Sequence, residues 1–158
     1  MSKYILLLLF PLFASPLFAQ SNTEVAACLR ACLMAPELEV AFTQEWGDLR
    51  PLYLRKREVA SIGNQSIDEQ LNQLTGADFQ GLPWEVIPAT PEEILQLPAE
   101  EAQFGVLEAS IGFREEKAVV NFYVNLPNNA RKWMTASFLL QKEDGQWAIT
   151  QKSVEVRP

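Results

Sequence analysis

The two cysteines of the chain lie four residues apart, at Cys28 and Cys32, in the segment VAACLRAC. The sequence has no histidine and no third cysteine, so these thiols lack the partners that a zinc site, haem attachment or a Cys-His nucleophile would need. Their spacing is one residue longer than the C-x-x-C redox motif. Val25 and two alanines before Cys28 fit a lipid-attachment signal, but Glu24 and its neighbours separate them from the apolar stretch that such a signal must follow. We expect no metal and no cofactor.

The first 19 residues predict export. They contain one cation, Lys3, followed by an apolar core and a small residue at Ala19, which is typical of a cleaved signal peptide. We therefore expect residues 1–19 to be removed and residues 20–158 to form a single domain, either periplasmic or secreted. No later apolar stretch approaches the roughly 18 residues of a membrane helix, so we expect no membrane anchor.

An oxidising compartment favours a disulfide between Cys28 and Cys32. The geometry opposes it, because helical side chains at i and i+4 have Cβ atoms about 5–6 Å apart, whereas a disulfide needs roughly 3.5–4.5 Å. A bridge would therefore require a distorted helical turn. We expect the disulfide, with two buried thiols as the alternative, and a structural role in either case.

A second set of candidates lies on the mixed face predicted for the C-terminal strands. Glu108 and Tyr123 are a carboxylate and a phenol on neighbouring predicted strands, with Asn121 close by, and such a pair could transfer protons in a desolvated pocket. Cross-strand pairing on a solvated or dimerising face explains the same residues. Trp133 and Trp147 are predicted to share this face, where exposed aromatic side chains favour a protein interface. The remaining polar residues predicted there are Thr135, Ser137 and Gln151.

Charge is distributed unevenly along the chain. The net charge is −7, and loss of Lys3 with the signal peptide leaves 12 cations against 20 anions, a net charge of −8. Nucleic acid is not expected as a partner, since phosphate contacts need clustered cations. The segment from Glu58 to Phe113 contains ten acids and no Lys or Arg. It could steer a basic partner, although a solvated connecting region explains it as well.

A mainly helical region is predicted from about residue 22 to 98. Apolar residues at positions 25, 28, 29, 32 and 33 have the spacing of an amphipathic helix, which Asn22 or Thr23 would cap. Pro36 interrupts this helix, and a second helix should end near Gly47.

Two more helices are predicted from capping signals. Ser66 would cap a helix that runs to about Leu74, and Thr90 would cap another, with Pro91 at its first position and Glu93 closing the capping box. The stretch 52–59 could form a strand, and the stretch 77–89 a loop or short strand.

From about residue 103 to 157 the apolar period changes from helical spacing to two. Four alternating stretches are separated by the turn sequences REEK, PNNAR and EDGQ, which predicts an antiparallel four-stranded meander. Helices should cover its apolar face. The sequence therefore predicts an α+β fold.

The order of these elements resembles the nuclear transport factor 2-like, cystatin-like superfamily. The resemblance combines amphipathic N-terminal helices with long strands ending in a W…F-x-L…D-G-x-W-x-I hairpin, within residues 104–156. The motif residues are Trp133, Phe138, Leu140, Asp144, Gly145, Trp147 and Ile149. The resemblance implies a curved, cone-like sheet wrapped around helices, often with a pocket, and often a homodimer through the sheet. The superfamily includes enzymes and binding modules, so the fold does not decide the function.

We expect an exported, non-catalytic binding or interaction module whose partner is an unidentified protein or small-molecule ligand. The alternative is a small-molecule isomerase or dehydratase that uses Glu108 and Tyr123. A closed, partly apolar pocket around these two side chains would favour the enzyme. A flat exposed surface would favour the binding module.

Overall fold

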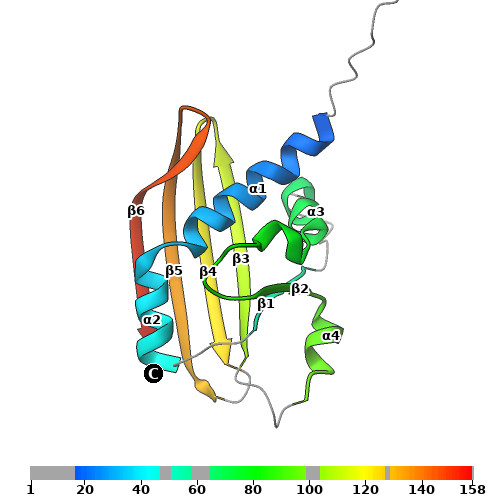
Figure 1. Cartoon of the computed structure of the whole chain (residues 1–158), viewed down its shortest axis with the longest axis vertical. Coiled ribbons are helices and arrows are strands. Elements are labelled where there is room, and N and C mark those ends of the chain that lie inside the picture. Colours follow the sequence, from blue (N-terminus) through cyan, green and yellow to red (C-terminus); the bar gives the residue numbers. More distant parts are fainter. Residues whose placement is uncertain (1–16, 47–50, 58–64, 99–103, 127–128, 158) are drawn as a thin grey trace, which may run out of the picture.

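The structure is a computed structural model that describes residues 17–46, 51–57, 65–98, 104–126 and 129–157. In these residues it is a mixed α+β fold, with helices packed on one face of an open six-stranded sheet (Figure 1). The predicted α+β class is confirmed. The sheet has six strands instead of the four predicted, because two short strands from the helical region join it.

The first two helices are separated by a proline. Helix α1 (Leu17–Leu33) ends just before α2 (Pro36–Trp46), and the proline ring cannot donate the hydrogen bond that a continuous helix would need. The break predicted at Pro36 is therefore confirmed. The predicted cap at Asn22 or Thr23 is wrong, since α1 continues through both positions.

The next helical elements are short. Helix α3 (Gln65–Gln73) begins before Ser66, so the predicted cap there is wrong, and a 3₁₀ turn, η1 (Gly76–Phe79), follows it. Helix α4 (Pro91–Leu95) has the predicted capping box. The N–H of Glu93 donates to the Thr90 hydroxyl oxygen over 3.2 Å, and the N–H of Thr90 donates to the Glu93 carboxylate over 2.7 Å.

The sheet has the order β2-β1-β3-β4-β5-β6. The last four strands are consecutive antiparallel neighbours, whereas β1 lies parallel to both β2 and β3. The strands are β1 (Leu52–Arg55), β2 (Val86–Ala89), β3 (Gly105–Arg114), β4 (Lys117–Leu126), β5 (Asn129–Glu143) and β6 (Gln146–Arg157).

Two of the three predicted turns lie in the described residues. Asp144 and Gly145 join β5 to β6 with φ angles of 48° and 80°, as a two-residue hairpin turn with positive φ at both positions requires. Glu115, with φ of 55°, begins the turn between β3 and β4. Residues 127–128 of the PNNAR turn lie outside the described residues, and β5 already begins at Asn129.

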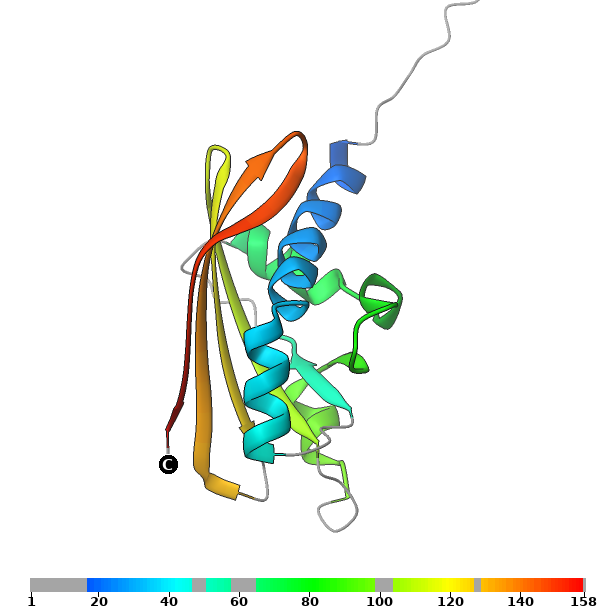
Figure 2. The same cartoon turned by 60° about the vertical axis from the view of Figure 1, so that its left-hand side comes forward.

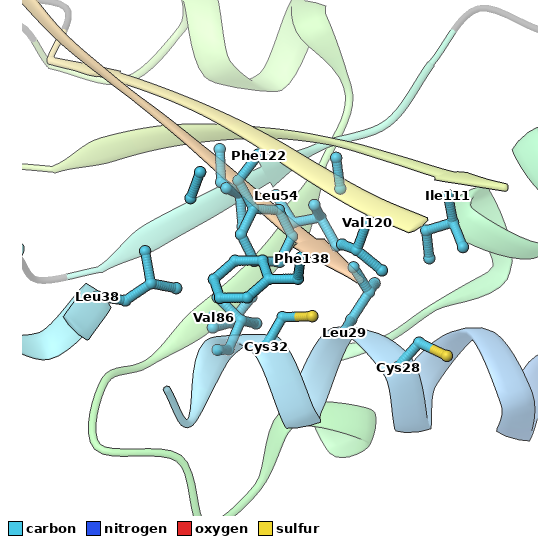
Figure 3. Close-up of a cluster of buried hydrophobic side chains, with 14 of the residues drawn as sticks. Cys28, Leu29, Cys32, Leu38, Leu54, Val86, Ile111, Val120, Phe122 and Phe138 are labelled. Atoms are coloured by element: carbon cyan, nitrogen blue, oxygen red, sulfur yellow. The ribbon is translucent and has the colours of Figure 1, made fainter. Parts of the chain in front are cut away.

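The helices cover one face of the sheet, which we call the inner face. Figure 1 shows α1 crossing the strands and α2 lying in front of β6. In α1, the side chains of Val25, Cys28, Leu29 and Cys32 are all fully buried against this face. Figure 3 shows Phe122 and Phe138 above the part of α1 that carries Leu29 and Cys32. The inner face consists of Leu107, Ala109, Ile111, Ala118, Val120, Phe122, Val124, Met134, Ala136, Phe138 and Leu140.

Two polar anchors hold elements that apolar packing alone would not orient. The guanidinium of Arg30 on α1 donates to the backbone oxygens of Asp78 (3.0 Å) and Gln80 (2.8 Å) around η1. The amide side chain of Asn72 on α3 exchanges two hydrogen bonds with the backbone of Arg57, of 2.9 and 2.8 Å. These bonds fix η1 to α1 and the end of β1 to α3.

A β-bulge changes the direction of the side chains along β6. Leu139 pairs with Gln151 and Leu140 pairs with Ile149, so Thr150 is an extra residue whose hydroxyl donates to the Leu139 carbonyl oxygen over 3.1 Å. One extra residue reverses the alternation. Trp147 therefore faces the helices, and the prediction that it shares a face with Trp133 is wrong.

Replacing Phe138 by alanine tests the core. Phe138 is buried and meets Phe122 edge to face, with ring centroids 5.7 Å apart. We expect Phe138→Ala to lower the free energy of unfolding by about 3–5 kcal/mol, because it leaves a cavity between α1 and the sheet. Urea denaturation measures the loss, with the exposed Val119→Ala as a control that should change stability by about 0.5 kcal/mol or less. A loss below about 1 kcal/mol for Phe138→Ala would contradict this packing.

Candidate functional site: the open face of the sheet

Beyond the end that α4 borders, the face of the sheet opposite α1 and α2 is uncovered over β3 to β6, and Figure 2 shows it bare on the side away from these two helices. We call it the open face. Cross-strand pairs place the predicted polar residues here, with Glu108 opposite Tyr123, Tyr123 opposite Thr135, and Asn121 opposite Ser137. The open face consists of Glu108, Ser110, Val119, Asn121, Tyr123, Asn125, Trp133, Thr135, Ser137, Leu139, Gln151, Ser153, Glu155 and Arg157.

An aromatic–arginine cluster, made of Tyr123, Trp133 and Arg157, crosses three neighbouring strands on this face. The rings of Tyr123 and Trp133 lie 5.4 Å apart, and the Arg157 guanidinium lies 5.2 Å from the Trp133 ring. Glu155 accepts a hydrogen bond of 2.9 Å from Arg157 and so fixes the cation over the ring. Tyr123 is 37% exposed, so the cluster presents aromatic surface to solvent. The sequence alone did not indicate that Arg157 lies over Trp133, because this contact depends on the strand register after the bulge.

The three residues predicted for catalysis lie on the open face, where Glu108 lines a pocket that neither Tyr123 nor Asn121 lines. Glu108 and Tyr123 are direct cross-strand neighbours, as the alternation predicted. Arg55 donates to Glu108 over 2.6 Å, in an ion pair whose side chains are 46% and 39% exposed. Asn121 accepts a hydrogen bond of 2.8 Å from Ser137 and is exposed. The arrangement offers a carboxylate and a phenol side by side, with the carboxylate already engaged by a cation.

A small pocket lies at the β1 end of the open face, beneath α4. It encloses about 250 Å³, and we call it the α4 pocket. Its polar lining is Arg55, Glu108 and Asn125, and the side-chain oxygen of Asn125 is buried without a hydrogen-bond partner among the described residues. The apolar lining is Pro91, Ile94, Leu95 and Val106. Sequence reasoning missed Arg55 and Asn125, since only the pairing of β1 with β3 brings Arg55 to this place.

A wider groove of about 530 Å³ runs between α2 and β6. Lys152 on β6 bonds to Glu37 on α2 over 2.6 Å at this groove. The hydrogen bond from Lys152 lowers the pKa of Glu37. This ion pair joins the second helix to the edge strand, beside the apolar side chains of Val40, Val154 and Val156.

On the helix side, Glu24 ties α1 to the β5–β6 hairpin. Its carboxylate accepts hydrogen bonds from the Lys142 ammonium and, over 2.5 Å, from the Trp147 indole N–H. Burial alone would raise the pKa of Glu24, but the hydrogen bonds and the charge of Lys142 outweigh it and lower this pKa overall. Trp147 thus has a structural position, with its ring also 5.7 Å from that of Phe113.

The cysteines lie in the core and not at the site. Both are free and fully buried in the structure, so the expected Cys28–Cys32 disulfide is not formed. The reason is the regular geometry of α1, which holds side chains at i and i+4 too far apart for a bond. Burial, together with the negative charge of Glu24, raises the pKa of Cys28 to about 12, and burial raises that of Cys32 as well. Neither thiol is activated as a nucleophile.

The described residues contain no group of three or more Cys, Asp and Glu side chains arranged to hold a metal ion. Among their helices, none is both long enough and apolar enough to cross a membrane.

Comparisons with protein-family models, with curated proteins and with solved structures gave no match to this chain. The geometry of the chain itself defines the class of protein. It is an α+β fold whose sheet is covered by α1 and α2 on one face and is largely open on the other.

Thiol counting tests the state of the cysteines. In the native protein at about pH 8, we expect neither Cys28 nor Cys32 to react with a thiol reagent, because both are buried and protonated. After denaturation without reductant, both thiols should react. Absence of reaction in the denatured protein would show that the disulfide forms after all.

Glu24→Gln tests the anchor on α1. A carboxylate whose pKa is lowered by folding stabilises the native state above its unfolded pKa, and this contribution disappears as the pH falls through the folded pKa. We expect the variant to be less stable by about 1 kcal/mol or less at neutral pH, since the pair is partly solvated. The difference should shrink below about pH 4. Unfolding measured against pH checks this, with exposed Glu39→Gln as control, and a pH-independent difference would contradict it.

Proposed function

We propose that this protein is an exported binding module that engages a protein partner through the open face of its sheet. The observation that carries the proposal is the aromatic–arginine cluster of Tyr123, Trp133 and Arg157 on the face of the sheet that α1 and α2 leave uncovered (Figure 2). Trp, Tyr and Arg are the residue types that most often dominate binding energy at protein interfaces. They provide large contact areas with few rotatable bonds.

The cluster is held in position before any partner arrives. The aromatic rings contact each other across strands, and Glu155 fixes Arg157 over the Trp133 ring. Less side-chain freedom is therefore lost on binding, which favours affinity. Asn121 and Ser137, hydrogen-bonded to each other, supply a polar border of the kind that surrounds the centre of an interface.

The net charge favours a basic partner, because long-range attraction raises the rate of encounter with an acidic protein. Export rests on the predicted signal peptide at residues 1–19. The resemblance to nuclear transport factor 2-like proteins adds a cone-like sheet and a homodimer through the sheet, so a second copy of the chain is another occupant of the same face. Helices on one face of a sheet that ends in long antiparallel strands support this part of the proposal.

The isomerase or dehydratase alternative has one observation in its favour, namely that Glu108 and Tyr123 are direct neighbours. Proton transfer at a useful rate needs a site from which water is excluded. Tyr123 is exposed and does not line the α4 pocket, and Glu108 is paired with Arg55. This geometry supports the binding module better.

Photo-crosslinking tests the partner surface. A photoreactive phenylalanine at Tyr123 should crosslink one protein from the extracytoplasmic fraction of the source cells, or a second copy of this chain. The additional change Trp133→Ala should reduce the yield by about tenfold or more, since loss of a central aromatic residue costs roughly 2 kcal/mol of binding. A photoreactive residue at exposed Met34 on the helix side is the matched control. Equal crosslinking from both positions, or no effect of Trp133→Ala, would overturn the proposal.

A further inference from the structure

We infer that the α4 pocket binds a primary amine, with the ammonium group on its acidic and amide side chains and a short apolar tail against α4. The site adjoins the aromatic–arginine cluster on the open face but shares no residue with it. Amine binding at this pocket would add a small ligand to the protein partner of the proposed function.

The head group would meet two oxygen acceptors. Arg55 engages Oε1 of Glu108, which leaves Oε2 as an acceptor. Asn125 pairs with Val106, two residues before Glu108, so Glu108 and Asn125 are diagonal neighbours on one face, at a backbone separation of about 7–8 Å. An ammonium group has three donors and can bridge two such side chains.

Asn125 gives an independent reason to place a donor here. Its side-chain oxygen is buried and has no hydrogen-bond partner in the described part of the chain. A buried carbonyl oxygen without a partner is costly, and almost all such groups in folded proteins are paired. Rotation of this amide toward a donor in the pocket that it lines would relieve the cost.

The apolar lining of the pocket is the reason to infer an alkyl tail on the ligand. Leu95 is 84% exposed, the highest value among the large apolar side chains that the structure describes as exposed. It borders the pocket together with Ile94 from the same helix and Val106 from the sheet. A short alkyl chain lying against them would remove this apolar surface from water, which is favourable in proportion to the area covered.

The free carboxylate oxygen of Glu108, Oε2, favours a cation over a carboxylate. Arg55 and Glu108 cancel each other, and Arg55 holds the carboxylate in a fixed position. The segment Glu58–Phe113, which supplies α4, contributes acids and no Lys or Arg. An added carboxylate would compete with Glu108 for Arg55, whereas an ammonium group can donate to the Oε2 atom that Arg55 leaves free.

The test uses hexylamine, hexanol and hexanoate, which have six carbon atoms each and differ in the head group. Methyl NMR spectra of the isotope-labelled protein follow Ile94, Leu95 and Val106 during titration. We expect saturable shifts of these methyl groups with hexylamine, at a dissociation constant on the order of 1 mM for seven heavy atoms. Binding of hexanol and hexanoate should be weaker by about fivefold or more, since neither supplies a positively charged donor.

Matched variants distinguish binding at the pocket from general attraction of a cation by the acidic protein. Glu108→Gln should weaken hexylamine binding by about tenfold. Glu155→Gln removes a carboxylate that is also paired with an arginine on the same face, but outside the pocket, and should change binding by less than about twofold. Each tail methylene removed should weaken binding by up to about fourfold, and this dependence should diminish in Leu95→Ser.

Three results would overturn the inference: no saturable shift at the pocket methyls, hexanoate binding as tightly as hexylamine, or equal losses in Glu108→Gln and Glu155→Gln. Trp133→Ala should leave amine binding unchanged. The NMR titration therefore does not bear on the proposed protein-binding face. Loss of the crosslinked partner in Trp133→Ala likewise does not bear on the pocket.

Discussion

Burial of the apolar stripe of α1 against the sheet is the interaction on which the rest of the structure depends. Val25, Cys28, Leu29 and Cys32 lose all solvent contact in this packing, and the rings of Phe122 and Phe138 lie above the part of α1 that carries Leu29 and Cys32 (Figure 3). Because side chains alternate along a strand, fixing one face against the helix determines which residues remain on the other. The position of α1 thereby defines the open face, and the contact between Glu24 and the β5–β6 hairpin sets where α1 lies along it.

The local features of the fold were predictable where the chemistry is local. The Thr90–Glu93 capping box and the Asp144–Gly145 turn need only neighbouring residues, and both form as expected. The short strands β1 and β2 were not assigned to the sheet. Each has four residues. Parallel strands are not joined by a short turn, so no turn sequence indicated that these two strands pair.

The candidate site was predictable in part for the same reason. Alternation alone placed Glu108 and Tyr123 on one face, and the structure makes them direct neighbours. It placed Trp147 on the wrong face, because a single extra residue at Thr150 reverses the alternation and no sequence pattern marks it. The disulfide was favoured by the compartment, whereas the geometry of a regular helix decided against it.

The parallel pairing of β1 has a consequence for the order in which the chain folds. Leu52 pairs with Gly105, so this contact must close a long loop, whereas the hairpins of the meander close over turns of a few residues. Long-range pairing loses chain entropy when the loop closes, before its contacts have formed, and therefore forms late. The meander with α1 would then assemble first, and β1 would dock onto β3 last and detach most easily. Arg55 reaches the α4 pocket only through that final docking, so any ligand held there would also hold the last-formed part of the domain in place.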